Sequence, residues 1–136
     1  MSSLVRLLKH AQLRLSEMTN TALEPYGISG RELGVLTELA DDEPASQQDA
    51  ARRLGIDRTS MVAFIDALEA KGLVERRPHA LDRRRNVVAL TATGRRTLRE
   101  AVSVSERVER DFLKPLTGLD GQQLKEALVS LIEGSA

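Results

Sequence analysis

The 136-residue chain contains no cysteine and no tryptophan, and its only aromatic residues are Tyr26, Phe64 and Phe112. The absence of cysteine excludes disulfide bonds, redox sensing through thiols and cysteine-ligated metal sites. With so few aromatic rings the core must be aliphatic, and 21 leucines supply most of it. This composition favours packed helices over a sheet. The length predicts a single domain spanning residues 1–136.

Long apolar runs are missing as well. No segment approaches the ~18 consecutive apolar residues that a transmembrane helix needs. The first residues lack the apolar stretch and the small-residue cleavage site of a secretory signal. We therefore expect no membrane association and a cytoplasmic location.

The net charge is zero, but the charges are unevenly distributed along the chain. Residues 52–99 carry twelve Arg and Lys against five Asp and Glu, a balance of +7, and the remaining residues carry −7. A basic block in a neutral chain indicates a local anion-binding surface. Sixteen of the twenty basic residues are Arg. Guanidinium groups suit phosphates and guanine edges, although the base composition of a genome can produce the same bias.

Proline and glycine divide the chain into short amphipathic segments. The apolar spacing predicts helices over 3–20, 29–40, 47–54, from Asp57 or Thr59 to about 71, 92–114 and 119–133. The period changes after Gly72, where residues 73–77 and 86–90 are predicted to be two strands of a hairpin. The predicted fold class is therefore mainly α, with one β-hairpin.

The segments 47–54 and 57–71, separated by Gly55, have the pattern of a helix-turn-helix. In the second helix, Met61, Phe64, Ile65 and Leu68 are predicted to be buried, which leaves Arg58, Thr59, Ser60, Val62, Ala63 and Asp66 facing outward. Small and polar outward residues allow a helix to enter the DNA major groove. An ordinary helical hairpin with a solvated face would show the same pattern.

The hairpin that follows favours the DNA-binding interpretation. Its first strand carries Arg76 and Arg77, and its turn carries Asp82 together with Arg83, Arg84 and Arg85. Folding alone does not require so basic a turn. Guanidinium groups placed there are suited to contact phosphates or to enter the minor groove of duplex DNA.

Two stretches resemble winged helix-turn-helix regulators of the MarR type: Leu-Glu-Ala-Lys-Gly-Leu-Val-Glu-Arg at 68–76, and Asp-Arg-Arg-Arg-Asn-Val-Val-Ala-Leu-Thr-Ala-Thr-Gly at 82–94. The second contains the wing signature of that family, an Asp and an Arg two residues apart, followed by a strand that ends in Leu-Thr-x-x-Gly. The resemblance implies a homodimer that presents one recognition helix and one wing per subunit. It also implies that Arg84 enters the minor groove and that Asp82 orders the wing by pairing with an Arg.

By this resemblance, residues 29–91 form the DNA-binding lobe, and 3–20 with 92–133 form the dimerisation helices. The broad apolar stripes of those helices support the dimer independently, because the small lobe can cover only part of them. In the alternative arrangement, the three helices pack on one another within a monomer.

Two residues depart from the family pattern. Ala50 stands where a larger aliphatic residue is expected, and the outward positions of Val62 and Ala63 are often polar or basic in the family. Contacts with thymine methyl groups and contacts from the wing would therefore have to contribute more to recognition.

The functional hypothesis is a sequence-specific, ligand-responsive transcriptional repressor that binds an inverted-repeat operator in double-stranded DNA as a homodimer. The alternative is a winged-helix module that binds a protein partner, for which an apolar or acidic outer helix face and a neutral wing are expected. No catalytic motif or phosphate loop is present, so no enzymatic activity and no cofactor are predicted.

Evidence for a small-molecule or metal site in the sequence is sparse. A small aromatic or anionic effector could bind beside Arg6, His10, Arg14 and Tyr26, but each of these residues is equally well explained by packing or by surface exposure. The two histidines, His10 and His79, are far apart in the sequence, so no metal site is predicted. Metal binding by His10 with carboxylates is the lesser alternative.

Overall fold

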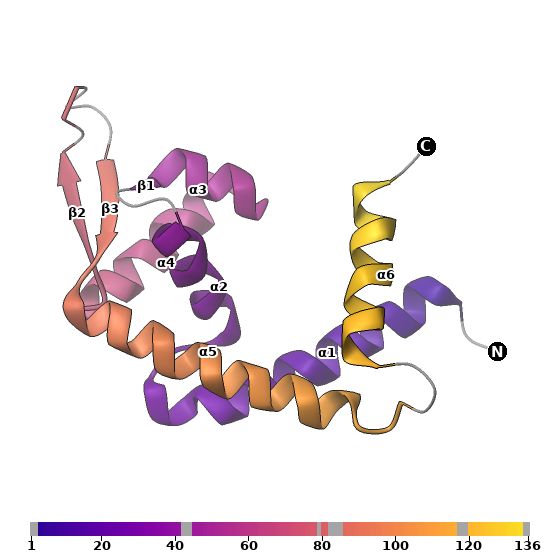
Figure 1. The fold of residues 1–136 in the computed structure, drawn as a ribbon. Helices are drawn as coiled ribbons and strands as arrows, with labels where there is room; N and C mark the ends of the chain where they lie inside the picture. The colour runs from indigo at the N-terminus through magenta and orange to yellow at the C-terminus, as the bar shows by residue number, and fades with distance from the viewer. Residues whose placement is uncertain (1–2, 42–44, 79, 82–85, 117–119, 135–136) are drawn as a thin grey trace.

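The computed structural model describes residues 3–41, 45–78, 80–81, 86–116 and 120–134 (Figure 1). The elements in chain order are α1 (Leu4–Leu23), the 3-10 turn η1 (Glu24–Tyr26), α2 (Gly30–Asp41), β1 (Ala45–Ser46), α3 (Gln47–Leu54), α4 (Arg58–Ala70), β2 (Val74–Pro78), β3 (Asn86–Leu90), α5 (Ala92–Leu113) and α6 (Gly121–Glu133). The predicted fold class, mainly α with a hairpin, is confirmed. None of the described helices combines the length and the apolar content needed to cross a membrane.

The molecule has a helical base and a smaller lobe (Figure 1). In the base, α1 packs along α5. The lobe holds α2, α3, α4 and the sheet, and α2 connects it to the base through contacts with both α1 and α5. The start of α1 and the whole of α6 lie at the end of the molecule opposite the hairpin (Figure 1).

The helices begin at the polar residues that the sequence indicates. Ser29 and Glu32, whose spacing in the sequence predicts a capping box at the start of α2, form it. The Ser29 N–H donates to Glu32 Oε1 at 2.9 Å, and the Glu32 N–H donates to Ser29 Oγ at 3.1 Å. Asp57, rather than Thr59, caps α4. Gly55 ends α3 in the left-handed conformation, with φ of 66°, which a glycine adopts without strain.

The sheet has one more strand than predicted. The expected hairpin is present, with Val74 opposite Leu90 and Pro78 opposite Asn86. The two-residue strand β1 adds to the other edge of β3, where Ser46 lies opposite Val87. The described strands have the order β1-β3-β2, so β3 is central, and its residues 87–90 are buried.

The core is aliphatic, as the composition predicts. Its fully buried side chains come from the lobe, from the end of α1 and from α5, namely Leu23, Val35, Leu36, Leu39, Ala50, Met61, Ile65, Leu68, Val88 and Ala101. Ala50, where a larger residue was expected, is completely buried between neighbouring elements. Its small side chain therefore suits a closely packed position.

The helical period of residues 92–114 predicts an inward apolar stripe, and this prediction is partly wrong. The predicted stripe consists of Leu98, Ala101, Val102, Ser105, Val108 and Phe112. Ala101 and Val108 are buried as expected, but Val104 is buried with them, and Val102 is 36% exposed. The buried positions follow an i, i+3, i+7 spacing that faces α1 and the lobe. Val102 lies on another side of the helix, where no described residue covers it fully.

A glycine joins the sheet to the base. A Cβ atom on Gly94, in the first turn of α5, would lie only 1.9 Å from the carbonyl oxygen of Leu73. Thr91 completes this joint, since its N–H donates to the Leu73 oxygen at 3.0 Å and its hydroxyl donates to the Gly72 oxygen at 2.6 Å. The Leu-Thr-x-x-Gly segment therefore fixes α5 against the strand β2, and only glycine fits its last position.

Much of the apolar surface of the base is uncovered in the single chain. On α1, Leu4, Val5, Leu7 and Leu8 are exposed, and on α6 the same is true of Val129, Leu131 and Ile132. None of the residues of α6 is buried. An ion pair between Lys125 and Glu109, 2.9 Å long, connects α6 to α5. Exposed apolar patches of this kind are typical of interaction surfaces.

Candidate nucleic-acid interface

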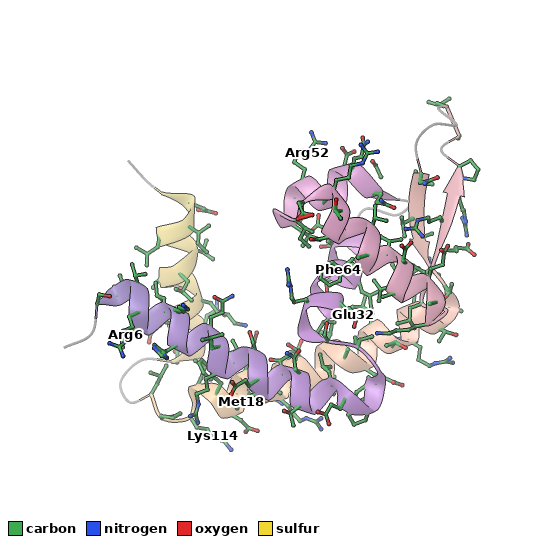
Figure 2. The ribbon with its side chains drawn as sticks, turned by 180° about the vertical axis from the view of Figure 1, so that it is seen from behind. Arg6, Met18, Glu32, Arg52, Phe64 and Lys114 are labelled. Carbon is green, nitrogen blue, oxygen red and sulfur yellow. The ribbon has the colours of Figure 1, made fainter. Side chains whose placement is uncertain are left out.

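Helix α4 presents the predicted outward residues on one side. Arg58, Thr59, Val62 and Ala63 are exposed and Ser60 is partly exposed, while Met61, Ile65 and Leu68 are buried on the opposite side. Phe64, predicted to be buried, is only partly so. The Arg31 guanidinium from α2 lies over its ring, 5.2 Å from the ring centre. Figure 2 labels Phe64 on α4.

The beginning of the exposed face is held by Asp57 and Ser60. The Ser60 N–H donates to Asp57 Oδ1 at 2.7 Å, and the Ser60 hydroxyl donates to Asp57 Oδ2 at 2.9 Å. These two hydrogen bonds hold the pKa of Asp57 below its usual range, and the bond from the Ser60 backbone has the larger effect. The hydroxyl proton of Ser60 is thereby occupied, and its oxygen remains able to accept a hydrogen bond from a base.

A pocket of about 360 Å³ with a mixed polar and apolar lining lies beside the start of α4. It is lined by residues of β1, α3, the turn after α3, α4 and the beginning of β3: Ser46, Gln47, Gln48, Ala51, Arg52, Ile56, Arg58, Met61 and Asn86. The sequence hypothesis did not include Gln48, Arg52 or Asn86. The signal for Arg52 was its place on the outward side of the first helix of the helix-turn-helix, which typically crosses the DNA backbone. Figure 2 shows Arg52 on the outer side of the lobe, far from Arg6 on α1.

The two arginines of β2 have different surroundings. The Arg76 guanidinium is 2.7 Å from Asp66 Oδ1 and 2.9 Å from Glu69 Oε1, so it bridges two carboxylates of α4. Arg77 pairs with Glu75 on its own strand, and its side chain is 57% exposed. Both arginines were expected to contact DNA phosphates. The exposed Arg77 is better suited to this contact than Arg76, whose guanidinium is already paired with two carboxylates.

The far end of α4 is fastened to α2 by Glu32 and Lys71. The Lys71 ammonium donates to both carboxylate oxygens of Glu32, at 3.0 and 2.7 Å. Burial raises the pKa of Glu32, but the hydrogen bonds from Lys71 and Ser29 outweigh it, and the resulting pKa is below the ordinary value. This ion pair, in which Glu32 is buried and Lys71 is exposed, helps to fix the orientation of α4 in the lobe.

Several of the predicted site residues are not among those that the structure describes. Asp82, Arg83, Arg84 and Arg85, and also His79, lie outside the described residues. Leu81, the last described residue before the wing arginines, is 92% exposed. The DNA-binding roles of Arg83, Arg84 and Arg85 and the wing-ordering role of Asp82 remain predictions.

The structure does not bring the effector candidates together in the single chain. His10 and Arg14 are exposed on α1, whereas Tyr26 is in η1 and packs, partly buried, against the core. Among the residues whose placement is described, no group of three or more His, Asp or Glu side chains could hold a metal ion.

Comparison with known proteins supports a regulatory role for this architecture. The sequence profile of the MarR family matches residues 26–85. The uncharacterized HTH-type transcriptional regulator YdgJ of Bacillus subtilis is 30% identical over 105 residues, which cover 77% of this chain and 64% of YdgJ. The transcriptional repressor MprA of Escherichia coli is 30% identical over 131 residues, which cover 95% of this chain and 74% of MprA.

Solved structures show the same fold. The transcriptional repressor CouR bound to a DNA duplex is 33% identical and superposes with a TM-score of 0.85, covering 96% of this chain and 90% of CouR. CouR of Rhodococcus jostii bound to p-coumaroyl-CoA superposes with a TM-score of 0.82 at 25% identity, covering 96% of this chain and 91% of that one. With its winged lobe, its long base helices and its similarity to MprA over almost the whole sequence, the chain belongs to the MarR family of transcriptional regulators, which are DNA-binding proteins and not enzymes.

Proposed function

We propose that this protein is a homodimeric, sequence-specific repressor that binds an inverted-repeat operator and responds to a small aromatic or anionic effector. The observation that carries the proposal is the exposed side of α4, where short side chains follow Arg58, which lines a pocket together with Arg52 of α3. The DNA complex of CouR, a relative with the same fold, supports it. A repressor of this kind acts in the cytoplasm, where the chromosome lies.

Recognition of the operator is assigned to the outward residues of α4. Val62 and Ala63 offer methyl groups to thymine, and the Ser60 oxygen can accept a hydrogen bond from a base. Arg58 and Arg52, which both line the pocket, are assigned to phosphates beside the groove. Arg77 and the predicted wing residues Arg83, Arg84 and Arg85 add contacts with phosphates or the minor groove.

The homodimer is assigned to α1, α5 and α6, with residues 29–91 as the DNA-binding lobe of each subunit. A second copy of the chain would cover the exposed apolar residues of α1 and α6. Such a dimer has two-fold symmetry, so its two α4 helices read two half-sites related by the same symmetry. The half-sites are expected about one helical turn apart, roughly 10 bp centre to centre.

Selection of bound sequences from a randomised duplex pool, followed by footprinting, tests this function. An inverted repeat with that spacing is expected, and a single asymmetric site would contradict it. Ala63→Gln is expected to add a preference for adenine, since a glutamine amide can pair with its major-groove edge. Ala70→Gln is the matched control, because Ala70 is an exposed alanine at the other end of the same helix. If both variants select the wild-type sequence, α4 is not the element that reads the bases.

The same assay separates the repressor from a protein-binding winged helix. A DNA-binding protein loses affinity for random duplex steeply as salt rises, because it releases counterions from the phosphates. A protein-interaction module is expected to show neither this salt dependence nor a preferred sequence.

Ligand response is the remaining part of the proposal. The p-coumaroyl-CoA complex of CouR supports a search among aromatic acids and their CoA thioesters. An effector is expected to release the selected operator from the wild-type protein. Separate His10→Ala, Arg14→Ala and Tyr26→Phe variants then test which of these candidates bind it, with operator affinity in the absence of effector as the control.

A further inference from the structure

Arg76 ties the strand β2 to α4 by ion pairs and hydrogen bonds, in addition to the apolar packing between the two elements. Its guanidinium pairs with Asp66 and Glu69, and its backbone N–H also donates to Glu69 Oε2 at 3.3 Å. The same guanidinium approaches the backbone oxygen of Val62 at 3.5 Å and Gln47 Oε1 of α3 at 3.4 Å. Arg76 therefore contacts both helices of the helix-turn-helix from the wing strand.

The two carboxylates that pair with Arg76, those of Asp66 and Glu69, would be unfavourable for DNA binding if they were unpaired. Asp66 and Glu69 are 62% and 43% exposed, and with Val62 they follow the i, i+4, i+7 spacing of one helix side. Val62 is among the residues assigned to base contacts. Two carboxylates beside it would repel the phosphates of a bound duplex, and Arg76 supplies the nearest compensating charge.

We propose that Arg76 is a positioning residue and not a DNA contact: it fixes the rotation of α4 relative to the wing strand and neutralises the two carboxylates beside the reading face. Its side chain is only 21% exposed, and its guanidinium is already held by three side chains and a backbone oxygen. A misrotated α4 would lose the contacts that distinguish one sequence from another, because those contacts depend on geometry, whereas attraction to phosphates does not. This inference rests on the proposed function.

The test compares Arg76→Gln with Arg77→Gln. Both variants remove one positive charge from adjacent positions of β2, and Arg77 pairs only within its own strand among the interactions described. The readout is the ratio of the affinities for the selected operator and for a random duplex, measured at several salt concentrations. Circular dichroism and melting temperature establish that each variant is folded at the assay temperature.

Arg77→Gln is expected to weaken both duplexes alike and to make the slope of log K against log salt shallower by about 0.9. Arg76→Gln is expected to lower the operator-to-random ratio by about tenfold or more, the usual effect of losing a good base contact. Arg76→Lys, which keeps the charge but reaches only one carboxylate well, is expected to restore part of the ratio. If Arg76→Gln keeps the wild-type ratio and lowers both affinities as Arg77→Gln does, the positioning role is wrong.

The double variant Asp66→Asn/Glu69→Gln tests these ion pairs with Arg76 intact, and it also serves if Arg76→Gln does not fold. If Arg76 positions α4, the operator-to-random affinity ratio is expected to fall, because α4 loses its ion pairs with β2. A phosphate contact by Arg76 predicts tighter binding to every duplex and an unchanged ratio. A wild-type protein without any sequence preference would contradict the proposed function itself, and this inference with it. If the wild type prefers the operator and neither Arg76→Gln nor Asp66→Asn/Glu69→Gln reduces that preference, this inference is wrong and the proposed function stands.

Discussion

Lys71 Nζ lies 2.7 Å from Glu32 Oε2, so the residue that caps the C-terminus of α4 forms an ion pair with the first turn of α2. Glu32 is the one buried charged residue among those described, and it accepts a third hydrogen bond from the Ser29 N–H. A buried carboxylate is tolerated only when such partners replace its water. The pair therefore couples the stability of the lobe to pH.

Replacing Glu32 with Gln is expected to destabilise the fold by about 1.5–3 kcal/mol at neutral pH, the range for hydrogen bonds to charged groups. Because the folded-state pKa of Glu32 lies below its ordinary value of 4.5, the stabilisation is complete above that pH and is lost as pH falls through the folded-state pKa. Thermal unfolding of wild type and variant across pH measures this. A gap in melting temperature that persists unchanged in strong acid would contradict the explanation, and a cycle with Lys71→Gln isolates the pair.

Gly94→Ala is expected to destabilise the protein by about 2 kcal/mol or more, because the new Cβ would overlap the Leu73 carbonyl oxygen. Gly34→Ala is the matched control. It lies inside α2 with no atom within 4 Å of the added carbon, so it is expected to stabilise the helix by about 0.5–1 kcal/mol. Denaturant unfolding measures the change in the free energy of unfolding for each variant. Equal changes in the two variants would argue against close packing of Gly94 on Leu73.

The double variant Leu8→Glu/Leu131→Glu is expected to abolish the proposed dimer, because it places charges on the exposed apolar surfaces of α1 and α6. Light scattering is expected to give twice the chain mass of 15.0 kDa for the wild type and the single mass for the variant. Leu81→Glu, at the highly exposed end of the hairpin, serves as the control and should remain dimeric. A monomeric wild type at micromolar concentration would contradict the assignment.

Arg84→Ala is expected to weaken operator binding by about 1–3 kcal/mol while leaving the fold intact, since a cation is removed from a confined groove. Fluorescence anisotropy at matched salt measures the loss. The corresponding variants of Arg83 and Arg85 provide the comparison, and if Arg84→Ala binds like wild type, the minor-groove role belongs to one of these neighbours.

Local signals in the sequence were sufficient for the helices, because caps and glycines act within a few residues. The capping pair of Ser29 and Glu32 and the end of α3 at Gly55 are examples. The strand β1 was missed since its identity depends on a distant partner, Val87. Val102 was misplaced because a helix with two apolar sides offers more than one possible stripe.

For the site, the outward face of α4 was predictable from the helical period alone. The ion pairs of Arg76 were not, because they depend on how the turn at Gly72 brings β2 back across α4. A sequence reveals that a cation is present on a strand, but the folded chain decides whether that cation is available to an external anion.

The central position of β3 has a mechanical consequence. This strand is bonded on one edge to the segment that enters α3 and on the other to the segment that leaves α4, and it continues through Thr91 into α5. The lobe is thus rigidly attached to a lever of 22 residues, about 33 Å long. A tilt of about 5° at the base of this lever would displace the lobe by roughly 3 Å, close to the 3.4 Å rise between successive base pairs. In the proposed two-fold dimer, a very small rotation far from the DNA would therefore be enough to move the two α4 helices out of register with the proposed half-sites.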